Sequence, residues 1–199
     1  MSKGRLEAFS DGVFAIIITI MVLELKIPKH DAADPNAVRS DTLYALKSIL
    51  PVFLSYVLSF VYIAIYWNNH HHMMHAVQYV NGSILWLNIH LLFWLSLVPF
   101  ATAWMGENNF TTWPVVVYGV VFIMAGIAYY FLAHQLLKIH GRDSKFGRAL
   151  GSDRKGKISV GLYAAAIALC FLNPFISVFL YAFVAAIWFI PDRRFEKAE

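Results

Sequence analysis

The sequence predicts an all-α, polytopic membrane protein, and three observations carry that prediction. Of its 199 residues, 59% are hydrophobic and only 14% are charged, whereas soluble domains carry about 25% charged residues. The hydrophobic residues gather in six apolar segments separated by polar stretches, which is typical of membrane helices. The single cysteine, Cys170, lies inside one of these segments, so a disulfide-stapled scaffold is excluded. The composition leaves no room for a sizeable soluble domain.

The six expected membrane spans belong to one domain that covers residues 1–199. Asn173–Pro174 is a turn signal between the last two spans, and Pro51 either bends the second span or lies in its first turn. The run NNHHHMMH, residues 68–75, is too polar for hydrocarbon and indicates a tight connection or a helix extension. We expect the spans at about residues 10–27, 43–67, 79–104, 113–137, 158–172 and 175–190.

Basic residues mark one side of the membrane. Lys3 and Arg5 precede the first span, and both the loop 138–157 and the tail 191–199 are rich in lysine and arginine. With six spans, all three stretches lie on the same side, and the positive-inside rule places that side and both termini in the cytoplasm. This asymmetry accounts for the net charge of +4 without a nucleic-acid partner. The basic loop can also touch anionic headgroups of the membrane lipids.

The first helix, expected from Arg5 to Pro28, organises the chain. Its charged head ends with Asp11, at the edge of an apolar run to Leu23 that only Thr19 interrupts. Ionisable groups in this position usually pair inside protein or face water. They mark function more often than packing, so this helix is the first place to look for a site.

One stripe of this helix combines small, branched and hydroxyl side chains. Gly12, Ile16, Thr19 and Leu23 follow the spacing i, i+4, i+7, i+11 and therefore share a face. Such a stripe suits the lining of a narrow pore, but small residues and threonine are also common where membrane helices meet. The Thr19 hydroxyl has the alternative of bonding back to the carbonyl of Ala15. The spacing alone leaves these interpretations open.

A histidine run, His70–His72 with His75, is the obvious candidate for metal binding. His71 and His75 are spaced i, i+4, but a zinc site needs a full tetrahedral set of ligands, and no cysteine or HExxH pattern is nearby. The alternative is a helix end whose imidazoles cap carbonyl groups or pair with acids. The run from His70 to His75, together with Asp11, leaves a secondary transporter or metal-ion permease as the competing function.

Signatures of enzymes and of known potassium filters are missing. The sequence contains no phosphate-binding glycine loop, no nucleophile elbow and no Cys/His pair, so we expect neither an enzyme nor a bound cofactor. It also lacks the filter sequence TVGYG and an arginine-rich voltage-sensing helix. A channel built from this sequence therefore needs a filter of side chains or an apolar constriction.

The head of the first helix resembles a known channel family. Residues 5–11 follow the pattern RxxxFSD and continue as GVFAIIITI, the second span ends in WxxH at Trp67 and His70, and residues 89–102 read IHLLFWLSLVPFAT. These features resemble the endosomal and lysosomal potassium channel family, transmembrane protein 175, and in particular its single-repeat bacterial members. The resemblance is strongest in the first three spans and is carried mainly by RxxxFSD, since WxxH alone is a weak signal.

The resemblance implies a four-fold homotetramer in a bacterial cell membrane, with four copies of the first helix lining a central pore. It implies passage of potassium and other monovalent cations without a P-loop filter. A hydrophobic constriction is implied at Ile16 and a selectivity-tuning ring at Thr19, with further lining by Gly12, Ile20 and Leu23.

A network of side chains at the head of the helix is expected to hold it in place. In this network we expect Arg5 and Asp11 to form an ion pair that compensates both charges. Losing either partner would leave the other charge unpaired. The expected members are Arg5, Phe9, Ser10, Asp11, Trp67 and His70.

Overall fold

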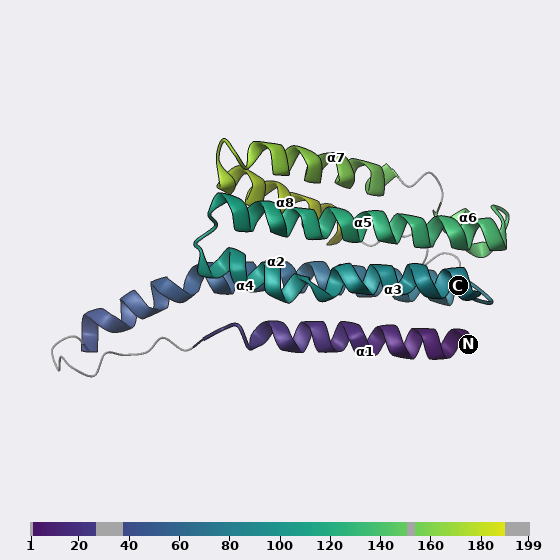
Figure 1. The fold of residues 1–199 in the computed structure, drawn as a ribbon, viewed down its shortest axis with the longest axis horizontal. Helices are drawn as coiled ribbons and strands as arrows, with labels where there is room; N and C mark the ends of the chain where they lie inside the picture. The colour runs from purple at the N-terminus through teal and green to yellow at the C-terminus, as the bar shows by residue number, and fades with distance from the viewer. Residues whose placement is uncertain (1, 27–37, 151–153, 190–199) are drawn as a thin grey trace.

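The computed structural model describes residues 2–26, 38–150 and 154–189, and within these ranges the chain forms helices and no strand (Figure 1). Short turns and loops join most of the helices. The described helices are α1 (Lys3–Val22), α2 (Val38–His75), α3 (Gly82–Ser96), α4 (Val98–Glu107), α5 (Thr112–His140), α6 (Lys145–Leu150), α7 (Arg154–Leu169) and α8 (Pro174–Phe189).

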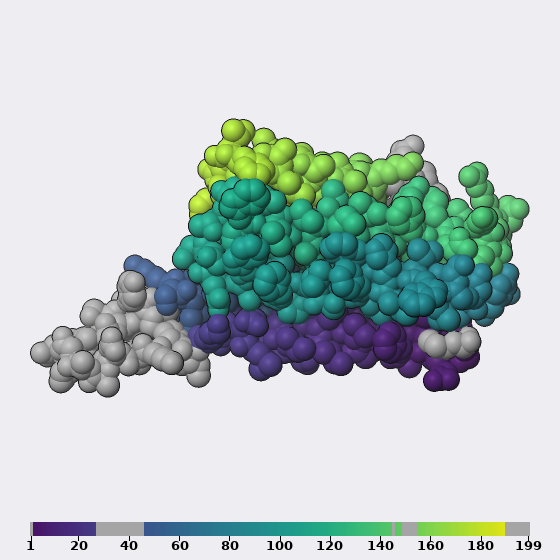
Figure 2. Space-filling model, in the orientation of Figure 1, coloured from purple at the N-terminus to yellow at the C-terminus, as the bar shows by residue number. Residues whose placement is uncertain are grey.

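The helices form an elongated bundle with α1 along one edge and α7 along the opposite edge (Figure 1). α1 contacts α2, α3 and α4, whereas α5 lies in the middle and contacts α3, α4, α7 and α8. Figure 2 shows α1 as a long purple edge of the molecule. The start of α1, the end of α5 with α6, and the start of α7 all lie at one end of the bundle (Figure 1).

Three of the described stretches are long and apolar enough to cross a membrane by length and composition: Leu46–His75, Gly82–Glu107 and Thr112–His140. α8 is also apolar but shorter. α1 is long enough, but its first turns are charged. These three stretches and α8 overlap the expected second, third, fourth and sixth spans.

Several expected segments differ from the helices observed. The first span was expected to reach residue 27, whereas α1 ends at Val22. The expected third span, 79–104, is divided at Leu97 into α3 and α4, because Pro99 lacks the N–H that would continue the hydrogen-bond ladder. The Leu97 amide donates instead to the carbonyl of Trp94 at 3.2 Å. In addition, α2 continues through residues 68–75, so the polar run NNHHHMMH is a helix extension rather than a tight connection.

An aromatic core joins α2, α5 and α8. The rings of Tyr62 and Phe122 lie with their centroids 4.3 Å apart, and the Tyr62 hydroxyl donates to the carbonyl of Tyr181 at 2.6 Å. The Tyr181 hydroxyl donates in turn to the carbonyl of Val115 at 3.2 Å. Because these buried hydroxyl groups are hydrogen-bonded, the core fixes the relative positions of the three helices.

Replacing Gly119 by alanine is expected to lower the melting temperature of the purified protein. A Cβ atom at Gly119 would lie 2.0 Å from the hydroxyl oxygen of Tyr181, and overpacking of this kind costs about 1–3 kcal/mol. Gly161 on α7 is the matched control, because a Cβ there meets no atom within 4 Å and alanine favours a helix. Equal melting temperatures for Gly119→Ala and Gly161→Ala would contradict this account of the core.

Candidate functional site

α1 has one buried face and one exposed face. The buried residues are Leu6, Ser10, Phe14, Ile17 and Met21. They recur every three or four positions and therefore form one stripe along the helix. This stripe faces α2, α3 and α4, which are the neighbours that α1 contacts.

The predicted lining positions all lie on the exposed face of α1. Ile16 is 57% exposed, Ile20 is 42% exposed and Leu23 is 73% exposed, and Gly12 and Thr19 are exposed as well. A Cβ atom added at Gly12 would meet nothing within 4 Å. The fold thus gathers the five predicted positions on one surface of the molecule.

A groove of about 640 Å³ runs beside this face, between α1 and the α3–α4 pair. Ile16 and Ile20 line it from α1, and Pro99 and Phe100 line it from α4. Phe100 is 60% exposed. Apolar surface of this extent marks a contact with lipid or with another protein chain.

An ion pair closes the groove at the end remote from the N-terminus. Glu24 and Glu107 line the groove there, and the Lys26 ammonium group binds the Glu107 carboxylate. This pair ties the chain that follows α1 to the end of α4. It joins the two segments at the end opposite to the charged head of α1, and because both side chains are exposed it adds little to stability.

Thr19 hydrogen-bonds to the main chain of its own helix. Its hydroxyl oxygen lies 3.0 Å from the carbonyl oxygens of Ala15 and Ile16, to which it donates. The expected back-bond to Ala15 is therefore present. Because a hydroxyl group has one hydrogen and two lone pairs, the oxygen keeps its capacity as an acceptor on the exposed face. Back-bonding and a role toward a cation are thus compatible.

A series of hydrogen bonds between buried polar side chains holds α1 against α2 and α3. The side-chain nitrogen of Asn88 donates to the hydroxyl oxygen of Ser10 at 2.9 Å, and the side-chain oxygen of Asn88 lies 2.8 Å from Nε2 of His70. Since an amide oxygen only accepts, the imidazole donates from Nε2. Ser10 donates its own hydrogen to the carbonyl of Leu6 at 2.9 Å. Ser10, Asn88 and His70 are each at most 1% exposed.

Asn88 belongs to this hydrogen-bonded set but was not among the residues predicted from the sequence. It joins two of the selected residues, Ser10 from the RxxxFSD pattern and His70 from the WxxH pattern. The available signal was a carboxamide that, together with His90, interrupts the apolar run ILWLNIHLLF. Polar side chains in membrane helices are expensive and mark function or tight packing, so Asn88 qualified as a candidate on that ground.

Asp11 joins the head of α1 to α2 through Trp67, whose Nε1 donates to the Asp11 carboxylate at 3.0 Å. The expected ion pair between Arg5 and Asp11 is not formed, and this expectation is corrected. In the described part of the chain, the ion pairs are Lys3–Glu7 and Lys26–Glu107. The physical reason is the spacing, because residues at i, i+3 and i, i+4 are neighbours on a helix, whereas residues at i, i+6 are not.

Phe9, another expected member of the network, is 54% exposed and lies outside the buried hydrogen-bonded set. Successive residues on a helix point in different directions. Phe9 therefore lies on the exposed side of α1 although the next residue, Ser10, is buried. Ser10 and His70 belong to the buried hydrogen-bonded set, and Asp11 and Trp67 form a second contact beside it.

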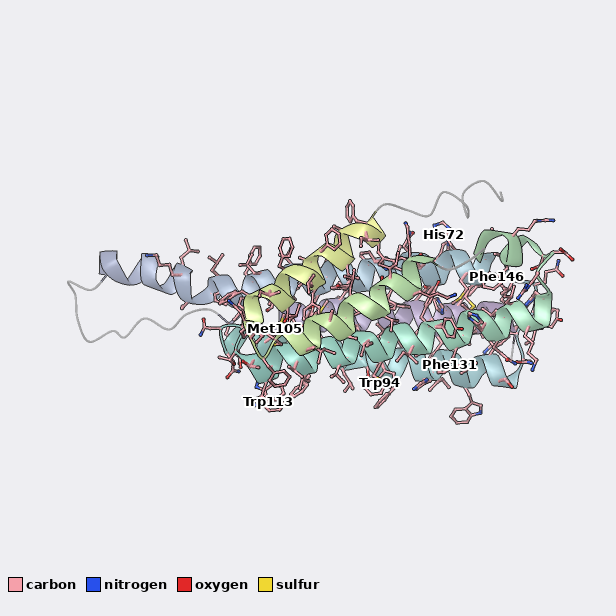
Figure 3. All side chains as sticks on the ribbon, turned by 90° about the horizontal axis from the view of Figure 1, so that it is seen from above. His72, Trp94, Met105, Trp113, Phe131 and Phe146 are labelled. Carbon is pink, nitrogen blue, oxygen red and sulfur yellow. The ribbon has the colours of Figure 1, made fainter. Side chains whose placement is uncertain are left out.

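The histidine run is divided by the fold. His70 is buried against Asn88, and its ring lies 5.6 Å from that of Phe14. The ring of His71 lies 5.8 Å from that of Trp67 and 6.2 Å from that of His75. His72 lies on α2 near the end of the bundle where Phe146 is found (Figure 3). Among the described residues, no group of three His, Cys, Asp or Glu side chains is placed to hold a metal ion.

These features define an all-α membrane protein whose first helix is fastened by its polar head and exposed along its other face. Residues 5–99 match the family described as "Endosomal/lysosomal potassium channel TMEM175". A potassium channel of Chryseobacterium sp. (strain P1-3) is 51% identical over 198 residues, which are 100% of this chain and 98% of that protein. The chain belongs to this family.

Two further comparisons agree with that assignment. A potassium channel of Chamaesiphon minutus (strain ATCC 27169 / PCC 6605) is 34% identical over 197 residues, covering 94% of this chain and 92% of its own length. The crystal structure of a lysosomal potassium-selective channel TMEM175 homolog from Chamaesiphon minutus matches with a TM-score of 0.81 at 30% identity. That match covers 96% of this chain and 97% of the other. The resemblance expected from RxxxFSD and WxxH is therefore confirmed.

Proposed function

We propose that this chain is one subunit of a potassium-permeable cation channel, a homotetramer in which four copies of α1 surround a central pore. The observation that carries the proposal is the exposed face of α1, which places Gly12, Ile16, Thr19 and Leu23 on one line. The full-length relatives named as potassium channels support the choice of permeant ion. Other monovalent cations are expected to pass as well.

The composition of this face favours a pore over plain contact with lipid. Hydrocarbon suits a uniformly apolar surface, whereas Gly12 exposes its backbone and Thr19 exposes a hydroxyl oxygen. Small residues also allow helices to approach closely. The groove beside α1, with the exposed Phe100 on its far wall, offers a surface that a neighbouring subunit can cover, as each copy of a closed ring does.

The mechanism follows from the side chains in order along α1. A ring of Ile16 makes a short apolar neck, which stays dry when it is narrow and so gates by dewetting. A ring of Thr19 oxygens lies about one turn further on and replaces part of the water around the cation. Ile20 and Leu23 continue the lining. The contacts of Ser10 and Asp11 do not touch the ion; they hold α1 at the distance that sets the width of the neck.

The proposal includes six spans in one domain, residues 1–199, with both termini in the cytoplasm of a bacterium. The start of α1 and the basic segment between α5 and α7 lie at the same end of the bundle (Figure 1). This arrangement supports one basic side, which the positive-inside rule assigns to the cytoplasm.

The test is reconstitution of the purified protein in vesicles with opposed potassium and sodium gradients. The parent should give a reversal potential that favours potassium. Thr19→Ala should lower the ratio of potassium to sodium permeability by about threefold to tenfold, since a differential interaction of about 0.7–1.4 kcal/mol gives that factor. Thr19→Ser keeps the hydroxyl oxygen and should retain most of the ratio.

A reversal potential that is indifferent to Thr19→Ala would remove the selectivity role of this residue. Potassium flux that requires a proton gradient and shows no single-channel currents would indicate the secondary transporter instead. The histidine run gives no support to a metal-ion permease in the part of the chain that the structure describes, because His70 is engaged with Asn88.

A further inference from the structure

A pocket of about 470 Å³ opens between α2, α5, α7 and α8, on the side of the bundle away from α1. Its volume lies within the range of about 300–1,000 Å³ that is usual for small-molecule sites. Phe131 and Tyr130 form part of its rim and are 50% and 38% exposed. Phe131 lies toward the same end of the bundle as His72 and Phe146, whereas Met105 and Trp113 mark the other end (Figure 3).

The walls of the pocket are aromatic, and their polar atoms are turned to protein partners. The Tyr62 hydroxyl donates to the carbonyl of Tyr181 at 2.6 Å. Nε1 of Trp188 donates to the hydroxyl oxygen of Ser159 at 2.7 Å, and that hydroxyl donates to the carbonyl of Lys155 at 2.8 Å. With these groups satisfied, the pocket offers mainly ring faces and aliphatic side chains, so the occupant that fits is apolar.

One end of the pocket is cationic. Lys157 is exposed and carries the only formal charge among the described lining residues. The ammonium group of the nearby Lys155 lies 5.9 Å from the centre of the Trp188 ring, close enough for a cation–π contact. Both lysines lie in the first turn of α7, and the apolar part of α7 follows them. The pocket therefore combines an apolar body with a positive mouth at a helix end.

We infer that this pocket binds an anionic phospholipid, with one acyl chain among the aromatic rings and the headgroup phosphate beside Lys157. A phospholipid matches both the apolar body and the positive mouth of the pocket. A lysine at a helix end lies at the depth of the lipid headgroups, and the aromatic rings lie at the depth of the acyl chains. In the proposed tetramer α1 faces the axis, and this pocket faces the surrounding bilayer. The inference requires only that the chain spans a membrane, so its failure would leave the proposed pore intact.

The experiment uses the fluorescence of Trp188 in phosphatidylcholine vesicles with increasing fractions of phosphatidylglycerol whose acyl chains are brominated. Bromine quenches indoles in contact with it. The difference between the parent and Trp188→Phe isolates the signal of the pocket from that of the other tryptophans. That signal should be quenched at a lower fraction of brominated phosphatidylglycerol than of brominated phosphatidylcholine.

Two variants separate the parts of the site. Lys157→Gln should raise the phosphatidylglycerol fraction at half-quenching about fivefold, the factor expected for one lysine near an anionic surface. Lys138→Gln, an exposed lysine at the end of α5 and outside the pocket, should leave it unchanged. Gly126→Leu should reduce quenching of Trp188, because Gly126 lines the pocket and its Cβ would meet only the Tyr66 hydroxyl, at 3.7 Å.

Equal half-quenching fractions for the two lipids would overturn the inference, and so would equal shifts in Lys157→Gln and Lys138→Gln. Relief of quenching by inorganic phosphate alone would assign the positive mouth to a small ion and would also overturn it. Lys157 is exposed, so its substitution keeps the test valid even where Gly126→Leu fails to fold.

Discussion

Replacing Ile16 by asparagine is expected to raise the single-channel potassium conductance by at least about tenfold. In the proposed tetramer the change places four carboxamides in the narrow neck, where water and a partly hydrated cation can bond to them. Lowering the barrier by about 1.4 kcal/mol is enough for a tenfold effect, and four polar groups in an apolar ring exceed that readily. The measurement is a planar-bilayer recording in symmetrical potassium chloride.

Two controls decide whether the effect belongs to the neck. Ile16→Val keeps the ring apolar and should leave the conductance low. Ile158→Asn makes the same chemical change on α7, at a position that is 55% exposed and so comparable to the 57% of Ile16. Its conductance should equal that of the parent. Unchanged conductance in Ile16→Asn would contradict the proposed apolar neck at Ile16. An equal rise in Ile158→Asn would show that the effect does not come from that neck.

Replacing Asn88 by alanine is expected to cause a large loss of stability, of about 2–5 kcal/mol. The change removes the acceptor of the His70 Nε2 hydrogen and the donor to the Ser10 oxygen. Both partners are buried, and each buried polar group left unsatisfied costs about 1–3 kcal/mol. Thermal unfolding of the purified protein in detergent measures the effect as a lower melting temperature.

Asn108→Ala is the matched control for this prediction. Asn108 follows the last residue of α4, is exposed, and its side chain donates to the carbonyl of Trp104 at 2.9 Å, so its loss should change the melting temperature little. His70→Ala added to Asn88→Ala should cost less than the sum of the two single changes, since the two residues share one hydrogen bond. Similar melting temperatures for Asn88→Ala and Asn108→Ala would contradict the role of the buried hydrogen-bonded set.

The face of α1 was predictable because helical spacing is a local property. Gly12, Ile16, Thr19 and Leu23 share a stripe in any regular helix, and the structure places them on the exposed side. The same reasoning applied to Arg5 and Asp11 would have excluded their ion pair, because a spacing of i, i+6 does not bring side chains together on one helix. The need to compensate the two charges suggested a pairing that the geometry of a single helix does not permit.

Features that depend on contacts between distant segments were harder to predict. Asn88 bridges Ser10 and His70 across three helices, and no spacing rule connects those positions. The basic stretch 138–157 was expected to be a loop, yet it contains α6, which the fully buried Phe146 anchors to the bundle. One apolar residue in a charged segment carries too little periodic signal for a helix to be recognised.

The hydrogen bonds of Thr19 have a consequence for the sign of the ions that can pass. Each hydroxyl hydrogen is directed along the helix to the carbonyls of Ala15 and Ile16, so a ring of these residues presents only oxygen lone pairs toward the proposed axis. Chloride needs a hydrogen to bind and finds none in such a ring. In the proposed pore, such a ring would favour cations over chloride through the orientation of four neutral groups, with no acidic side chain required.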